Sequence, residues 1–90
     1  MSIQNIMAEV SIHPLRIDSL SGLIKAFIDV LRSEPGLDIN VGNMSTQVVG
    51  ESNMVFLMLE KAFSSVAKEN ECVMTVKVSN ACPYSPPDQE

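Results

Sequence analysis

The sequence predicts a single α+β domain whose elements follow the order strand, helix, strand, strand, helix, strand. Apolar residues alternate with other residues in segments 6–12 and 72–78, which is the period of a half-buried strand. Apolar residues recur every three or four positions in segments 20–31 and 55–66, which is the period of an amphipathic helix. A glycine and an asparagine at 42–43 are typical of a tight turn between two strands.

The first strand is expected from Ile6 to Ile12 and ends at His13-Pro14, because proline cannot donate a hydrogen bond to a neighbouring strand. Its even-numbered residues share one face, so Glu9 lies mid-strand on the other face. The first helix follows, with Asp18 or Ser19 as candidate N-caps, and runs to about residue 32 before Pro35-Gly36. Its apolar stripe is interpreted as core: Leu20, Leu23, Ile24, Phe27, Ile28 and Leu31.

The middle of the chain predicts a hairpin followed by the second helix. Segment 37–41 forms a short strand, residues 42–43 turn it back, and segment 45–49 forms the next strand. Ser52 or Asn53 is expected to cap a helix over about 54–69. The polar hairpin residues either face water only or bind a polar ligand, and the pattern does not choose between these two interpretations.

The last strand is predicted at Cys72–Val78, so that residues 1–80 form the domain. Residues 81–90 contain three prolines and two acidic residues and are expected to form an irregular tail. Truncation after Asn80 should therefore leave the fold intact, and both cysteines are expected to be unpaired thiols.

Two right-handed crossovers in this order predict a ferredoxin-like fold, a four-stranded antiparallel sheet with both helices on one face. The helix side of the sheet should carry Ile6, Ala8, Val10, Ile12, Met74, Val76 and Val78. The other face should carry Glu9, Ser11, Thr75 and Lys77, mixed with Met7 and Val73. No element remains to cover this face, so we expect a homo-oligomer, a dimer or tetramer, to cover it.

Composition excludes several classes of partner. The net charge of −5 argues against nucleic acid, which requires a basic surface. No apolar run approaches the roughly 20 residues that cross a bilayer, and the basic and apolar blocks of a signal peptide are missing, so a cytoplasmic protein is expected. Two separated cysteines and one histidine do not form a metal-binding pattern.

The residues also argue against the common activities of this topology. The first strand lacks the aromatic residues with which an RNA-recognition module stacks bases. No cysteine pair follows that strand, as a copper chaperone would need, and the loop near Arg16 lacks the glycines of an anion-cradling loop. The one histidine has no evident catalytic partner, so no enzyme is expected.

The segments AEVSIHPL (8–15) and GNMSTQVVGE (42–51) resemble the first strand and the hairpin signature of the YkoF-like family of small thiamine-binding proteins. The resemblance extends over about residues 6–77. It implies homo-oligomers built through the sheets, and binding of thiamine or its hydroxymethylpyrimidine moiety without catalysis. The sequence departs from the pattern at His13, where the family usually has an aromatic residue, and in the tail.

The residue types also suit an aminopyrimidine. A carboxylate can pair with the ring nitrogen and exocyclic amine, while hydroxyls and amides satisfy the remaining edges. The candidate ligand-binding residues are Glu9, Asn43, Ser45, Thr46 and Glu51. Two alternatives remain open: a small-molecule-sensing regulatory domain of the amino-acid-binding (ACT-like) type, and a purely structural oligomer.

Overall fold

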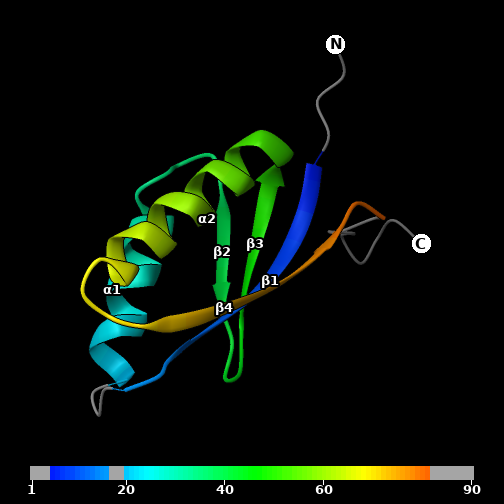
Figure 1. Ribbon diagram of the computed structural model, residues 1–90. Helices are drawn as coiled ribbons and strands as arrows, with labels where there is room; N and C mark the ends of the chain where they lie inside the picture. Colours follow the sequence, from blue (N-terminus) through cyan, green and yellow to red (C-terminus); the bar gives the residue numbers. More distant parts are fainter. Residues whose placement is uncertain (1–4, 17–19, 82–90) are drawn as a thin grey trace.

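The computed structural model describes residues 5–16 and 20–81 of the chain, which form an antiparallel sheet and two helices (Figure 1). The elements are β1 (Asn5–Pro14), α1 (Leu20–Arg32), β2 (Asp38–Val41), β3 (Thr46–Glu51), α2 (Ser52–Ala67) and β4 (Cys72–Ser79). The strand order is β2-β3-β1-β4, and every neighbouring pair is antiparallel. This is the predicted ferredoxin-like βαββαβ fold.

The hydrophobic core lies between one face of the sheet and the two helices. It is built from the even-numbered residues of β1, from Val48 of β3 and from the apolar stripes of both helices. Phe27 and Leu31 of α1 and Val55 of α2 are almost completely shielded from solvent. The helices pack against each other and against β1, while α1 also contacts β2 and α2 also contacts β3.

β4 extends beyond this helical cover. Among the described strands, β4 pairs with β1 alone, and its residues Cys72, Met74 and Val76 pack against the edge of the core. Met74 and Val76 are half-buried, and the side chain of Val78 is 46% exposed. The sequence placed these residues correctly on the helix side of the sheet, but no helix lies far enough across to bury them fully.

Several predicted element boundaries differ from the structure by one or two residues. β1 continues through Pro14, which pairs with Cys72, and the ladder ends where the N–H of Leu15 donates to the carbonyl of Glu71 at 2.8 Å. This is compatible with proline because it occupies the strand end. Ser45 belongs to the turn and not to β3.

The predicted cap of the second helix is wrong. α2 begins at Ser52, its N-cap is Glu51, and no side chain caps it. Asn53 instead accepts a 2.9 Å hydrogen bond from the N–H of Met54. The helix starts early because β3 leads into it without an intervening loop. The candidate caps of the first helix, residues 18–19, lie outside the described residues, as does most of the tail.

Gly50 is required by close packing. A Cβ at this position would lie 2.5 Å from Cδ2 of Leu37 and 3.3 Å from the carbonyl oxygen of Gly36. Leu37 is buried, so its side chain has little freedom to move away. The glycine therefore lets the loop before β2 pack directly on β3.

Candidate functional site

Side-chain hydrogen bonds hold the β2–β3 turn against β1. The hydroxyl of Ser45 donates to Oε2 of Glu9 at 2.9 Å, and the hydroxyl of Ser11 donates to the carbonyl of Met44 at 3.3 Å. Within the turn, the N–H of Gly42 donates to the carbonyl of Ser45 at 2.9 Å. The turn of residues 42–45 and the middle of β1 therefore form one structural unit.

Glu9 lies at the centre of the open sheet face, the face without helices. It is directly opposite Gln47 on β3 and Lys77 on β4. Directly opposite residues in antiparallel strands project from the same face of the sheet, so the carboxylate of Glu9 and the ammonium of Lys77 share this surface. The side chain of Glu9 is exposed and open to a ligand.

A shallow concavity of about 290 Å³ surrounds this group, and we name it the open-face concavity. Its acidic and basic groups are Glu9 and Lys77, and Ser45 and Met44 of the turn form one side. The complete lining is Glu9, Ser11, His13, Met44, Ser45, Thr75 and Lys77. The carboxylate, the ammonium and three hydroxyls can recognise a small polar molecule.

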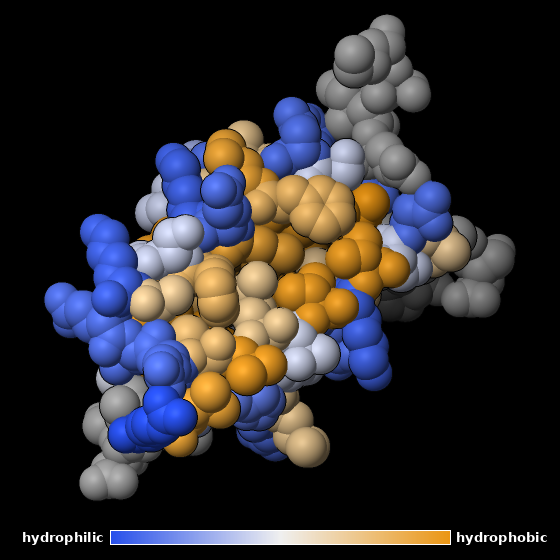
Figure 2. Space-filling view, in the orientation of Figure 1, coloured by the Kyte–Doolittle hydropathy of each residue, from blue (hydrophilic) through white to orange (hydrophobic). Residues whose placement is uncertain are grey.

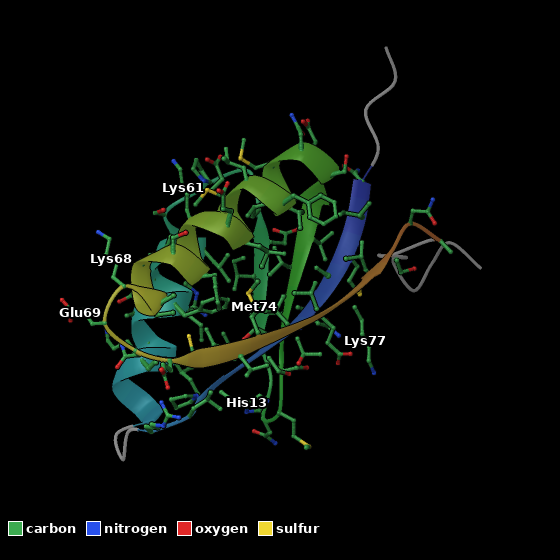
Figure 3. The ribbon with its side chains drawn as sticks, viewed as in Figure 1. His13, Lys61, Lys68, Glu69, Met74 and Lys77 are labelled. Carbon is green, nitrogen blue, oxygen red and sulfur yellow. The ribbon has the colours of Figure 1, made fainter. Side chains whose placement is uncertain are left out.

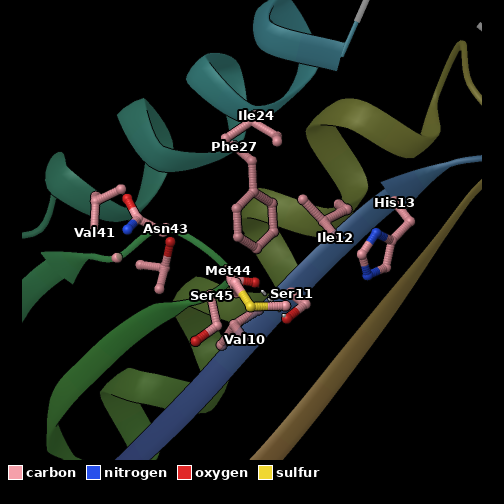
Figure 4. A pocket seen from close by; sticks show the side chains of 12 residues that line it. Val10, Ser11, Ile12, His13, Ile24, Phe27, Val41, Asn43, Met44 and Ser45 are labelled. Carbon is pink, nitrogen blue, oxygen red and sulfur yellow. Dashed lines mark hydrogen bonds between the residues drawn. The ribbon is translucent and has the colours of Figure 1, made fainter.

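A second concavity of about 280 Å³, the hairpin pocket, lies on the helix side of the same turn (Figure 4). The ring of Phe27 points into it from α1, with Ile24 beside it, and Val41 closes it at the β2 side. Thr46 and Asn43 supply polar groups. A mostly apolar pocket with a few polar groups is the usual form of a small-molecule site.

The predicted site residues are divided between the two concavities. Glu9 and Ser45 meet in the open-face concavity, while Asn43 and Thr46 line the hairpin pocket together with Ser45. Thr46 is the one buried polar side chain among the described residues, so it does not share a face with Glu9. Glu51 pairs with Asn5 at the far end of β3.

Glu51 is too remote to join either group. It lies four positions along β3 from Gln47, the cross-strand neighbour of Glu9, which corresponds to about 13 Å at the rise of an extended strand. No ligand the size of a pyrimidine can contact both carboxylates within one protomer. The structure therefore brings the candidates Glu9 and Ser45 together and leaves Glu51 apart from them.

The predicted site residues did not include several residues that line these concavities, among them Lys77, Met44, Phe27 and Ile24. Lys77 was placed on the correct face, but its position beside Glu9 depends on the register between β1 and β4. Phe27 and Ile24 belong to the apolar stripe of α1 and carry no local signal that distinguishes a pocket wall from core. Met44, which is 89% exposed, lines both concavities.

The described residues hold no group of three or more His, Cys, Asp or Glu side chains that could bind a metal ion. Cys72 is a free thiol, and Cys82 lies outside the described residues. Neither helix of the described chain combines the length and the apolar character that crossing a membrane requires.

The fold and the two concavities define a small ferredoxin-like domain with ligand-sized sites on both sides of one hairpin. The chain belongs to the thiamine-binding protein family, whose model matches residues 8–81. The resemblance carried by the first strand and the hairpin is thereby confirmed. A search of curated proteins gave no match.

Several solved structures have the same fold. A hypothetical protein from Methanocaldococcus jannascii is 26% identical, with a TM-score of 0.77, and the match covers 97% of this chain and 86% of that protein. A putative thiamine biosynthesis/salvage protein from Thermotoga maritima is 16% identical, with a TM-score of 0.78, and the match covers 93% and 91%. A domain of unknown function from Bacillus cereus is 19% identical, with a TM-score of 0.74 and coverage of 94% and 80%.

Proposed function

We propose that this protein binds thiamine or its hydroxymethylpyrimidine moiety without transforming it. The observation that carries the proposal is the carboxylate of Glu9, held by Ser45 in the open-face concavity of a chain from the thiamine-binding family. A carboxylate is the side chain that best matches an aminopyrimidine edge, because it accepts two hydrogen bonds side by side.

The hydrogen-bonding capacity of Glu9 fits this role. An ionised carboxylate has about four acceptor sites, and Ser45 occupies only one of them, on Oε2. Oε1 and the free position on Oε2 can accept from the exocyclic amine and from a protonated ring nitrogen. Ser11 and Thr75 offer hydroxyls around the same concavity.

The size of the concavity favours the one-ring fragment. A volume of about 290 Å³ is at the lower end of small-molecule sites, which typically measure about 300–1,000 Å³. A single pyrimidine fits such a space better than both rings of thiamine. The second ring would lie towards the turn or against another subunit.

The hairpin pocket is the second candidate location for the ring. Phe27 could stack on a flat heterocycle there, and the hydroxyl of Thr46 could hydrogen-bond to its edge. Two substitutions, Glu9→Gln and Thr46→Val, distinguish the locations, because Glu9 lines only the open-face concavity and Thr46 lines only the hairpin pocket of these two.

The proposed function includes self-association through the open face. This face mixes Met7, Val49 and Val73 with the opposite charges of Glu9 and Lys77, so it can complement a copy of itself. Covering it would enclose the open-face concavity and strengthen hydrogen bonds to a ligand.

The free thiol of Cys72 is in keeping with a reducing compartment, and we propose that the protein acts in the cytoplasm.

A second candidate function is amino-acid sensing. Its support is that Glu9 and Lys77, one acidic and one basic group, face the same concavity and could hold the ammonium and carboxylate of a free amino acid. The topology itself does not decide between the two, because one fold hosts many functions.

A thermal-shift and calorimetric screen tests both functions. The ligands are thiamine, hydroxymethylpyrimidine and the common amino acids, each added to at least 100 times its dissociation constant. Saturation to this degree stabilises the folded state by about 2.7 kcal/mol, which gives a clear rise in melting temperature. A response to amino acids alone would replace the thiamine proposal, and no response to any ligand would leave the structural-oligomer interpretation.

A further inference from the structure

The open face of the sheet carries two adjacent cross-strand pairs of polar residues. Glu9 of β1 lies directly opposite Lys77 of β4. The next pair on the same face is Ser11 opposite Thr75. The Cβ atoms of directly opposite residues are about 4.5–5.5 Å apart, and the next pair on the same face follows at about 7 Å along the strands. The four side chains therefore form one polar patch, and all four line the open-face concavity.

The two faces of β4 differ in character. Met74 and Val76 pack against the edge of the core, and Figure 2 shows apolar side chains gathered in the region between α2 and β4. Figure 3 shows Met74 and Lys77 on opposite sides of β4. Because the alternation of the strand buries its apolar residues against the helices, it fixes the ammonium of Lys77 on the open face.

Hydrogen-bonding capacity on this patch is divided between the two strands. On the β1 side, the carboxylate of Glu9 is an acceptor, and the hydroxyl of Ser11 already donates to the carbonyl of Met44 at 3.3 Å. On the β4 side, the ammonium of Lys77 and the hydroxyl of Thr75 are donors. No ion pair or hydrogen bond joins either of these donors to another side chain or carbonyl in the described part of the chain. A ligand that uses both sides must present donors towards β1 and an acceptor-rich anionic group towards β4.

A neutral hydroxymethylpyrimidine satisfies only one side of this arrangement. Its amine and ring nitrogen face the carboxylate of Glu9, but its hydroxyl offers the ammonium of Lys77 a single uncharged acceptor. The monophosphate ester of the same alcohol carries a charge of about −1.5 to −2 at neutral pH and three strong acceptor oxygens. The hydroxymethyl group is attached to the ring carbon next to the one that bears the amine, so the phosphate lies beside the amine as Lys77 lies beside Glu9.

We propose that the open-face concavity binds the phosphate monoester of the hydroxymethylpyrimidine in preference to the free alcohol, and that Lys77 determines this specificity. The inference rests on the proposed function, because Glu9 holds the aminopyrimidine edge of both ligands. The ammonium of Lys77 pairs with the phosphate through charge-assisted hydrogen bonds, and the hydroxyl of Thr75 donates to another phosphate oxygen. Each side of the patch then has a partner of the opposite hydrogen-bonding character.

The acidic character of the whole chain does not exclude an anion at this position. The formal net charge is −5, but exposed charges more than about 8–10 Å apart are largely screened at physiological salt. Among the residues that line the concavity, Glu9 is the one acidic group, and Lys77 and His13 are the basic groups. The local balance therefore favours an anion beside Lys77 once the carboxylate is paired with the amine.

The test is isothermal titration calorimetry of the full chain with hydroxymethylpyrimidine and with its monophosphate. The monophosphate should bind the parent protein about five- to tenfold more tightly at low salt, a gain between that of an exposed ion pair and that of a charge-assisted hydrogen bond. This preference should shrink when the salt is raised from about 0.05 M to about 0.5 M, because the screening length falls.

Matched variants assign the preference to Lys77. Lys77→Met removes the ammonium and keeps most of the side-chain length, so it should abolish the preference for the monophosphate. Lys77→Arg keeps the positive charge and should retain the preference. Lys68→Met on α2 is the control, since it removes an exposed ammonium that lines neither concavity, and it should also retain the preference. The readout is the ratio of two affinities on one variant, so a change in stability that affects both ligands cancels.

The failure of this proposal is distinct from the failure of the proposed function. Equal affinities of the parent for the two ligands, or a preference that Lys77→Met keeps, would overturn the specificity and leave binding of the pyrimidine in place. A parent that binds neither ligand would refute both proposals. Inorganic phosphate is the third probe, and an affinity equal to that of the monophosphate would also overturn the proposal, because the ring would then contribute nothing. Circular dichroism confirms that each variant is folded, and the salt dependence of the parent decides the test if Lys77→Met disturbs the strand.

Discussion

Replacing Glu9 by Gln is the most direct test of the candidate site. The substitution preserves the side-chain shape and the hydrogen bond from Ser45, because the amide oxygen can accept in place of Oε2. It removes the charge and one acceptor, and it introduces an NH₂ group that faces the amine of the pyrimidine. The change therefore affects the recognition of the ligand and leaves the turn in place.

The expected loss follows from the kind of hydrogen bond that is removed. A hydrogen bond to a charged group contributes about 1.5–3 kcal/mol, and about 1.4 kcal/mol corresponds to a tenfold change in affinity. Glu9→Gln should thus weaken binding of hydroxymethylpyrimidine by about 10- to 150-fold. The free energy of unfolding should change by less than about 0.5 kcal/mol, because Glu9 is exposed.

Isothermal titration calorimetry of the parent and the variant gives the affinities, and urea denaturation gives the stabilities. Glu60→Gln on α2 is the matched control, since it removes an exposed carboxylate that lines neither concavity. If Glu9→Gln binds as tightly as the parent while Thr46→Val loses binding, the hairpin pocket is the site and Glu9 is not the anchor. If neither variant changes the affinity, both assignments are wrong.

Two further predictions concern the fold. Gly50→Ala should destabilise the protein by about 1–3 kcal/mol in urea denaturation, because the new Cβ would press on the buried Leu37. Gly36→Ala is its control, since that Cβ would meet only the carboxylate of Glu34 at 3.3 Å, and equal stabilities would contradict the packing argument. Truncation after Asn80 should keep the melting temperature within a few degrees of the parent, because β4 ends at Ser79. A large fall would show that the tail contributes to the fold.

Much of the architecture follows from local patterns. The strand period in β1 and β4 identified which residues face the helices, and the helical period in α1 and α2 identified the core stripes. The order of these elements then restricted the topology, because crossover connections are right-handed. The predicted element boundaries were less accurate: the start of α2 and the end of β1 each differ from the structure by about two residues. The preference of single side chains for a helix or strand end is weaker than the hydrogen-bond ladder and the packing that the rest of the fold imposes.

The make-up of the candidate site depends on which face of the sheet each hairpin residue occupies, and sequence patterns could not resolve this for single positions. Ser45 and Thr46 are neighbours in the chain, yet Ser45 bonds to Glu9 on the open face while Thr46 is buried on the helix side. Moving the start of a strand by one residue exchanges the two faces, so the sequence could not show that these two side chains lie on opposite sides of the sheet.

The sequence alone thus determined which segments form helices or strands and in what order, because these properties depend on periodicity and turn chemistry within short segments. The tertiary structure decided which side chains lie beside Glu9. Strand pairing places Lys77 opposite Glu9 across β1 and β4, and the fold of the β2–β3 turn places Ser45 within 2.9 Å of its carboxylate. Such contacts join residues far apart in the chain, and they depend on registers that no local segment specifies.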